Sequence, residues 1–451
     1  MKLFFVSLGC DKNLVDSEKM LALLLEHDIV ITDDAQEAEV IIINTCGFIR
    51  DAKEESIETI LEMAEMKIKG HCHTLIVTGC LAQRYTEEIQ EEIPEVDVVV
   101  GTTAYDRILE AVQEGSNDTH LCLMRDLDYL PQGLTDRVRT SSPHISYLKI
   151  AEGCNKRCTY CSIPSMRGNY RSVPMDELLD EAVKLAASGT KELLVIAQET
   201  TVYGMDLYGE KKLPELLQHL CRISGIQWIR VLYCYPEEIT EELLFTIQKE
   251  KKICHYLDLP IQHCNDEILH KMGRRTDMDS LVHIIKKIRE IVPDMALRTT
   301  LISGFPGETE QQHRECVEFV AEQGFDRLGV FPYSAEEGTA AAEFEGQISE
   351  DIKQKRADEI MEAEQNIIFQ KNEEWIGKKC MVMVDGFMPE EGVYIGRTYR
   401  DAPDIDGCVF FRTENFSSEM ELVSGTIVPV CITKANGYDL IGEVDREEEE
   451  L

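Results

Sequence analysis

A chain of 451 residues with a hydrophobic content of 43% is long enough for about three packed domains. Its 46 Lys and Arg residues stand against 84 Asp and Glu residues, a formal net charge of −38, so the totals offer no basic footprint for binding the phosphates of a nucleic acid. The 16 cysteines, with no uncharged apolar run of about 18 residues, favour reduced thiols and metal ligation in a cytoplasmic protein over a disulfide framework or a membrane span.

The first segment repeats a strand and a cysteine three times. Apolar, β-rich runs occupy 2–9, 40–45 and 74–79, and each ends at a cysteine: Cys10, Cys46 and Cys80. A polar stretch with helical periodicity follows each run, which predicts a parallel α/β domain. Because ligands bind outside the carboxyl ends of parallel strands, we interpret the three thiols as the ligands of one metal cluster. The alternative is three unrelated core cysteines.

A second cysteine group follows the apolar run 145–150. Cys154, Cys158 and Cys161 form the pattern C-x-x-x-C-x-x-C. Three thiolates at this spacing can hold three irons of a 4Fe-4S cluster, and no fourth cysteine follows at ligand spacing, so one iron stays open to a small molecule. Structural zinc prefers paired C-x-x-C knuckles and four ligands, which this stretch lacks.

Alternating strands and helices continue after the cysteine loop. Strands are predicted at 145–150, 192–197, 228–233, 256–259, 296–302 and 327–331, with helices near 175–187, 214–221, 238–248, 279–292 and 310–323. Six parallel strands with outer helices form a partial (β/α)6 barrel, open on one side. As in full barrels, its chemistry belongs at the carboxyl strand ends.

The pattern changes after a long charged helix predicted at about 350–374. Short strands at 379–384, 392–397, 408–411 and 426–432, separated by Gly and Asp turns, predict a small antiparallel β-barrel. Residues 372–451 hold 7 Lys and Arg and 18 Asp and Glu, so their net charge is 7 − 18 = −11. We expect Asp401, Asp404 and Asp406 to face a basic partner, the alternative being a face that serves solubility only. The acidic tail 447–450 is expected to be disordered.

The cysteine loop, with an aromatic residue before its last cysteine, resembles the signature of radical S-adenosylmethionine (SAM) enzymes. The whole chain resembles the methylthiotransferase family of these enzymes, which implies an N-terminal cluster domain at 1–117, a radical SAM core at 140–369 and a TRAM barrel at 372–447. The stretches Ser7-Leu8-Gly9-Cys10-Asp11-Lys12-Asn13, Asn44-Thr45-Cys46 and Ile163-Pro164-Ser165-Met166-Arg167-Gly168 resemble the branch that modifies a ribosomal protein. The tRNA branch tends to carry Gln-Met-Asn after the first cysteine, and Asp11 departs from the proline often seen in the ribosomal branch.

The resemblance implies a ligand set for two 4Fe-4S clusters and SAM. Cys154, Cys158 and Cys161 would hold the SAM cluster, and Cys10, Cys46 and Cys80 an auxiliary cluster. Tyr160 would line the adenine of SAM, and other SAM contacts would come from strand-end residues: Gln198, Glu199, Arg298 and Gly304. Arg298 could equally be a structural ion pair, and Gly304 an ordinary turn. Asp258 is a weaker candidate, and His263, with no flanking ligands in sequence, is expected to pack or to hydrogen-bond.

The implied reaction is methylthiolation of an aspartate β-carbon in small-subunit ribosomal protein S-12, a basic protein. SAM would be both radical source and methyl donor, sulfur would be delivered at the auxiliary cluster, and an electron donor would be required. One alternative is the same chemistry on a tRNA adenosine, which an acidic terminal barrel disfavours. Another is an iron–sulfur electron carrier, which the incomplete cysteine sets disfavour because carriers usually close all four positions.

Overall fold

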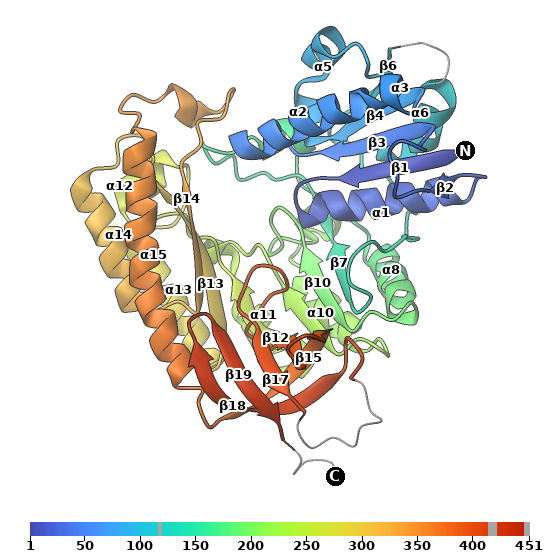
Figure 1. The fold of residues 1–451 in the computed structure, drawn as a ribbon. Helices are drawn as coiled ribbons and strands as arrows, with labels where there is room; N and C mark the ends of the chain where they lie inside the picture. Colours follow the sequence, from blue (N-terminus) through green and yellow to red (C-terminus); the bar gives the residue numbers. More distant parts are fainter. Residues whose placement is uncertain (116–119, 414–421, 446–451) are drawn as a thin grey trace.

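The structure, a computed structural model, describes residues 1–115, 120–413 and 422–445 (Figure 1). The tail expected to be disordered therefore lies outside the described residues. Within the described part, no helix combines the length and the apolar character needed to cross a membrane.

The N-terminal domain is a six-stranded parallel sheet in the order β2-β1-β3-β4-β5-β6. Its central strands β3 and β4 are buried along their whole length, as is typical of a parallel sheet covered on both faces. The strands are β1 Lys2–Ser7, β2 Val30–Ile31, β3 Val40–Thr45, β4 Thr74–Gly79, β5 Val98–Val100 and β6 Leu121–Leu123. The helices are α1 Asp11–Leu25, α2 Arg50–Ala64, α3 Met66–Lys69, α4 Cys80–Arg84, α5 Thr86–Glu92 and α6 Ile108–Glu114. The sheet extends past residue 117 because β6 pairs in parallel with β5, and strands of two or three residues carry too little periodicity to be recognised in sequence.

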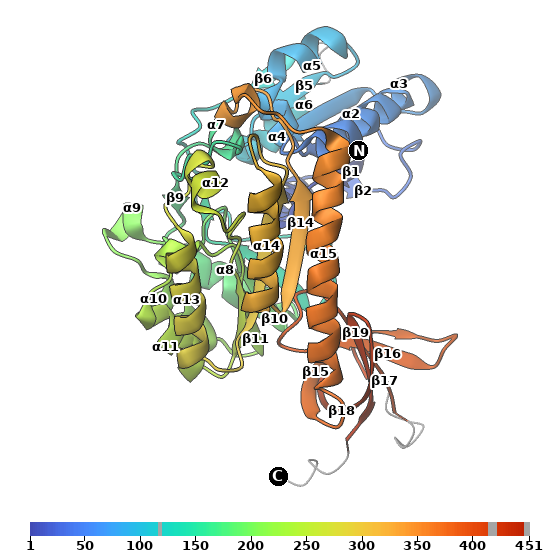
Figure 2. The ribbon, with the colours of Figure 1, turned by 90° about the vertical axis from the view of Figure 1, so that its left-hand side faces the viewer.

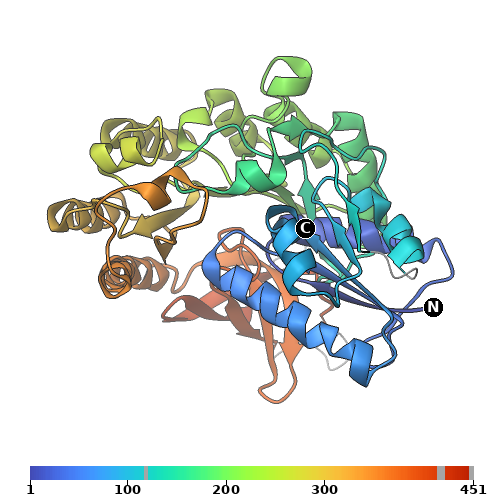
Figure 3. The same ribbon diagram turned by 90° about the horizontal axis from the view of Figure 1, so that it is seen from above.

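The central domain confirms the partial barrel. Its six parallel strands follow the order β14-β13-β12-β11-β10-β7 and do not close. The strands are β7 Ile145–Lys149, β10 Glu192–Ile196, β11 Trp228–Val231, β12 Ile253–Asp258, β13 Ala296–Ser303 and β14 Arg327–Pro332, and a separate small sheet is formed by β8 Ala151–Glu152 and β9 Arg171–Ser172. The helices are α7 Ile163–Arg167, α8 Met175–Ala187, α9 Met205–Tyr208, α10 Leu213–Cys221, α11 Glu241–Lys249, α12 Asp266–Lys271, α13 Met278–Ile291 and α14 Glu310–Gln323. Seen from above, the outer helices form an arc and the N-terminal domain lies over its open side (Figure 3).

The helix α15 Glu350–Glu373 runs along one side of the molecule from the level of the N-terminal domain to the terminal barrel (Figure 2). That barrel closes through the strand order β15-β16-β17-β19-β18. The strands are β15 Lys379–Met388, β16 Val393–Arg397, β17 Val409–Arg412, β18 Ile427–Asn436 and β19 Asp439–Val444. Four of the five pairings are antiparallel, whereas β17 and β19 pair in parallel, so the predicted barrel is present with one parallel seam.

The loop 398–406 of the terminal barrel fills the amino ends of the central strands, and we call it the barrel plug. The side chain of Asp401 pairs with Arg327 at the start of β14, and Asp406 accepts a hydrogen bond of 2.8 Å from the hydroxyl of Tyr256. Both carboxylates are buried; only Asp404 is exposed. The expectation that all three acidic residues face a partner is therefore wrong for two of them, because arginines of the central domain attract them inward.

Candidate functional site

The cysteines of the first triad lie at the carboxyl ends of three adjacent strands. Cys10 precedes α1, Cys46 follows β3 and Cys80 begins α4 directly after β4. Gly9 makes this approach possible: it has a φ of +88°, and a Cβ there would lie 2.8 Å from the Cβ of Cys46. A strand-end pattern read from sequence thus becomes a compact group of three thiols.

The second triad lies on the loop between β8 and α7. Cys154 and Cys158 are buried and Cys161 is partly exposed. Gly153 has a φ of +78°, and a Cβ there would lie 2.2 Å from the backbone oxygen of Asn169, so only glycine fits where the loop turns.

Burial favours the protonated form of three of these thiols. It raises the pKa of Cys46 and of Cys154 to about 11, and that of Cys161 to about 12. Backbone N–H groups next to the sulfurs of all three oppose this shift and favour the thiolate. A metal bound by these three sulfurs would displace their protons.

Neither predicted triad is closed around a single metal ion. Among the described residues, only His263, Cys264 and Cys316 bring three candidate ligand atoms within 4.8 Å of one another, so neither predicted triad is tight enough for one ion. Sets of three thiols with donor N–H groups match the ligation of a 4Fe-4S cluster.

The His263 group was missed in sequence because Cys316 lies on α14, far along the chain. It is not a convincing metal site. The Nδ1 of His263 accepts the backbone N–H of Asn265 at 3.0 Å, and its Nε2 lies 3.7 Å from Glu308. Since the Nδ1 lone pair is already engaged, the imidazole acts as the expected packing and hydrogen-bonding residue.

Arg167 connects the two cysteine loops. Its Nε donates to Cys80 at 3.3 Å, and its Nη1 lies 2.7 Å from Asp16 and 3.1 Å from Glu152. Its Nη2 donates to Asn13. The guanidinium is fully buried between the N-terminal domain and the central barrel, and its charge favours the thiolate of Cys80. The sequence placed Arg167 in a family motif but gave no sign of these partners.

Glu152 is the centre of the adjoining polar network. Lys149 lies 2.6 Å from its carboxylate, and the Nε2 of Gln198 donates to it at 2.6 Å. Arg167 and Lys149 hold the pKa of Glu152 far below its usual range in spite of burial. Gln198, predicted to contact SAM, is thus oriented by Glu152, and its own Oε1 is buried without a partner among the described residues.

Glu199, the second strand-end candidate, is buried beside the cysteine loop. Burial raises its pKa to about 7, although Thr201 donates to one carboxylate oxygen and Lys156 lies 3.8 Å from the other. Tyr160 packs against the apolar group around Phe305, which leaves its ring beside the second triad. Both residues remain predicted SAM contacts.

The other two predicted SAM contacts, Arg298 and Gly304, have close neighbours within the protein. Arg298 pairs with Asp258 at 3.0 Å and, through Nε, with Asp406 of the barrel plug at 3.7 Å. A Cβ on Gly304 would lie 2.3 Å from the Cγ of Lys353, so helix α15 accounts for the glycine. The ion pairs of Arg298 agree with its structural alternative, and both residues remain predicted SAM contacts.

Two buried cations near the triads were not recognised in sequence. Lys12, next to Cys10, places its Nζ 2.9 Å from the ring centroid of Tyr233. Arg274 stacks over Tyr235 at 4.2 Å, and the hydroxyl of Tyr235 lies 3.5 Å from Cys158. The Nε and Nη1 of Arg274 are buried without a hydrogen-bond partner among the described residues, so this cation can offset negative charge at the second triad.

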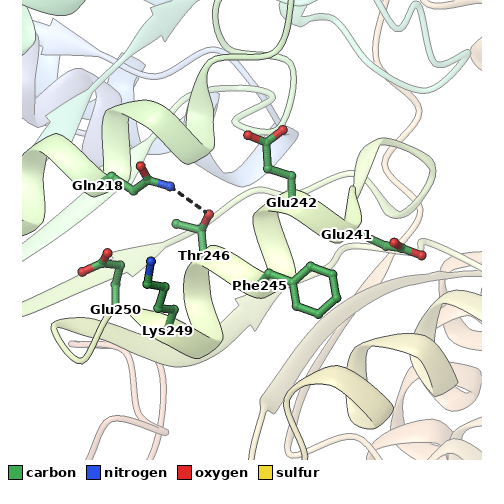
Figure 4. A pocket seen from close by; sticks show the side chains of 7 residues that line it. All are labelled: Gln218, Glu241, Glu242, Phe245, Thr246, Lys249 and Glu250. Carbon is green, nitrogen blue, oxygen red and sulfur yellow. Dashed lines mark hydrogen bonds between the residues drawn. The ribbon is translucent and has the colours of Figure 1, made fainter.

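A surface hollow elsewhere has no part in this chemistry. It lies on the outer face of α10 and α11 and is lined by Gln218, Glu241, Glu242, Phe245, Thr246, Lys249 and Glu250 (Figure 4). None of its lining residues is a cysteine, and the buried side of α11 faces the core instead.

Comparison with known sequences supports all three domains. Residues 2–101 match a family described as "Uncharacterized protein family UPF0004", residues 148–320 the Radical SAM superfamily and residues 376–444 the TRAM domain. The chain is 56% identical to "Ribosomal protein uS12 methylthiotransferase RimO" of Lachnoclostridium phytofermentans, over 99% of this chain and 100% of the relative. It is 49% identical to the protein of that name from Acetivibrio thermocellus, over 99% of each chain.

Solved structures share the fold at low sequence identity. The radical SAM methyltransferase TsrM from Kitasatospora setae superposes with a TM-score of 0.54 at 13% identity, covering 73% of this chain and 72% of TsrM. The cobalamin-dependent SAM radical enzyme OxsB gives a TM-score of 0.50 at 12% identity, covering 81% of this chain and 56% of OxsB. At these identities the likeness concerns the fold alone.

Proposed function

The chain belongs to the RimO family of radical SAM methylthiotransferases, and from this premise we propose that it methylthiolates an aspartate β-carbon of ribosomal protein uS12. It uses SAM and two 4Fe-4S clusters. The observation that carries the proposal is the pair of cysteine triads, one at the carboxyl edge of each parallel sheet, with Arg167 between them. An electron carrier would usually close all four positions of each cluster with cysteine.

The two cysteine triads have different roles in this proposal. Cys154, Cys158 and Cys161 would hold the cluster that binds SAM, and Cys10, Cys46 and Cys80 the cluster at which sulfur is delivered. When bound, the clusters supply the electron that cleaves SAM reductively and the sulfur that is transferred. The protein orients these groups, shields four of the six thiols from water and keeps Glu152 ionised through its two cations.

The test uses anaerobically reconstituted enzyme with SAM, a chemical reductant and purified uS12. We expect mass spectrometry to find a methylthio group on one aspartate of uS12, and none on tRNA nucleosides offered in parallel. Replacing Cys10, Cys46 and Cys80 by Ala should abolish this transfer while 5′-deoxyadenosine still forms. Modification of tRNA instead of uS12 would refute the substrate, and loss of SAM cleavage in a folded variant that keeps its first cluster would refute the division of labour.

A further inference from the structure

Lys12 is a buried cation at the edge where the two sheets meet. It is the second residue of α1, its exposed fraction is 6%, and its Nζ lies over the ring of Tyr233, which follows β11 of the central barrel. An ammonium group in such a place normally pairs with a carboxylate, because an unpaired buried charge is costly.

Within the described residues no carboxylate lies within 4.0 Å of Lys12. The acidic side chains nearest to it are each held by another donor: Asp11 by the hydroxyl of Tyr233, Asp258 by Arg298, and Glu152 by Lys149 and Arg167. The described residues thus leave Lys12 without a carboxylate of its own, although the thiol of Cys10 and the ring of Tyr233 lie near it.

The other cations of this region are already engaged or lie elsewhere. Arg167, Lys149, Lys156 and Arg298 each pair with carboxylates. Arg274 pairs with none among the described residues, but it stacks on Tyr235 beside the second triad. Among the described cations of this region, Lys12 alone lacks a carboxylate partner and lies two residues from Cys10 of the first triad.

The aromatic ring beneath Lys12 belongs to Tyr233, a residue with a strained backbone conformation. Tyr233 has a φ of +62°, a left-handed backbone that a bulky residue rarely adopts. Two contacts hold it there: its N–H donates to Asp258 at 3.1 Å, and its carbonyl accepts from the N–H of Thr200 at 3.0 Å. Strain of this kind persists where a site must be held in one arrangement.

The chemistry of the proposed substrate supplies the missing partner. The β-carbon of an aspartate is bonded directly to its carboxylate carbon, so the group next to the reacting atom enters a buried site with a negative charge. A buried cation can pair with that charge and offset the cost of burying it.

We infer that the ammonium group of Lys12 binds the side-chain carboxylate of the substrate aspartate and so selects an acidic residue for methylthiolation. This inference rests on the proposed function. Tyr233 positions Lys12, and the hydroxyl of Tyr233 keeps Asp11 from neutralising it. Lys12 is a substrate-binding residue in this scheme, and it takes no part in holding iron.

The test compares two substrates with three reconstituted enzymes. The substrates are uS12 and a uS12 variant in which the modified aspartate, located by mass spectrometry in the wild-type reaction, is replaced by asparagine. The enzymes are wild type, Lys12→Met and Lys12→Arg, with Lys69→Met as a control because Lys69 is exposed and pairs only along its own chain segment with Glu65. For each we measure the kcat/KM of methylthiolation, 5′-deoxyadenosine formed without substrate, iron per chain, and equilibrium binding of both substrates without reductant.

We expect wild type and Lys12→Arg to prefer the aspartate substrate, and Lys12→Met to lose about 30-fold or more in kcat/KM and in binding for it, since one partner of a buried charge pair is gone. Binding of the asparagine substrate, SAM cleavage and iron content should stay unchanged, as should all properties of Lys69→Met. A Lys12→Met enzyme that still prefers aspartate, or a Lys12→Arg enzyme that does not, overturns the inference.

Loss of auxiliary iron from Lys12→Met would also overturn it, because Lys12 would then serve the cluster. Failure of the wild-type enzyme to modify uS12 at all would instead refute the proposed function, so the two failures are distinguishable.

Discussion

Replacing Arg167 by Met tests whether the buried ion network holds the two cysteine loops together. The guanidinium lies 2.7 Å from Asp16 and 3.1 Å from Glu152. Its removal leaves these two carboxylates with Lys149 as the one cation paired with them among the described residues. Breaking a buried pair from one side costs about 3–5 kcal/mol, because the remaining charge stays buried and uncompensated. We therefore expect the free energy of local opening of α1 to fall by about that amount.

Native-state hydrogen exchange of the backbone amides of α1 measures this quantity directly, without assuming that a protein of several domains unfolds in one step. The matched control is Arg50→Met, since Arg50 is exposed and pairs only with Glu54 one turn away. Its α1 protection should equal that of wild type. Unchanged protection of α1 in Arg167→Met would show that packing alone holds this junction and would refute the reasoning.

Three further predictions follow from the geometry. Replacing Cys154, Cys158 and Cys161 by Ala should remove about half of roughly eight irons per chain, measured after anaerobic reconstitution, whereas an unchanged iron content would refute the ligand assignment. Asp401→Asn should lower the free energy of unfolding by about 3 kcal/mol, because Arg327 loses the nearer of its two buried carboxylate partners and keeps only Asp406 at 4.0 Å. Asp404→Asn, exposed on the same loop, should leave the denaturation curve unchanged, and equal effects of the two substitutions would contradict the burial of Asp401. Burial raises the pKa of Glu364 from its ordinary value of 4.5 to about 7. Between these two pH values the native state holds a proton that the unfolded chain has released. The free energy of unfolding therefore falls as pH rises through this window. Glu364→Gln should reduce that slope in denaturation curves recorded across the window, and an unaltered slope would show that Glu364 does not titrate there.

The sequence predicted the elements whose signal is local. The run 40–45 and the helices at 175–187 and 310–323 carry strong periodicity, and the structure confirms their bounds. The position of cysteines at strand ends followed from the alternation of strands and helices alone.

What sequence reasoning missed depends on contacts between distant segments. Asp401 and Asp406 were assigned to the surface because acidic residues are seldom buried unless they are paired, and their arginine partners lie more than 70 residues away. The same holds for Arg167, whose partners include Asn13 and Cys80, and for Lys12 on Tyr233. Composition indicates that charges exist, but only the fold shows which of them meet.

The barrel plug has a consequence for how this chain can be divided. Arg397 and Arg230 share Glu192 inside the amino end of the barrel, and the carbonyl of Tyr399 accepts from Arg230. A fragment that ends before the terminal barrel would open this end of the central barrel to solvent. Glu192, Arg230 and Arg327 would then lose their partners in the terminal barrel and contact water. The central domain and the terminal barrel are therefore expected to stay together in evolution. A chimera that exchanges terminal barrels must also exchange the residues at the amino ends of the central strands that contact the barrel plug.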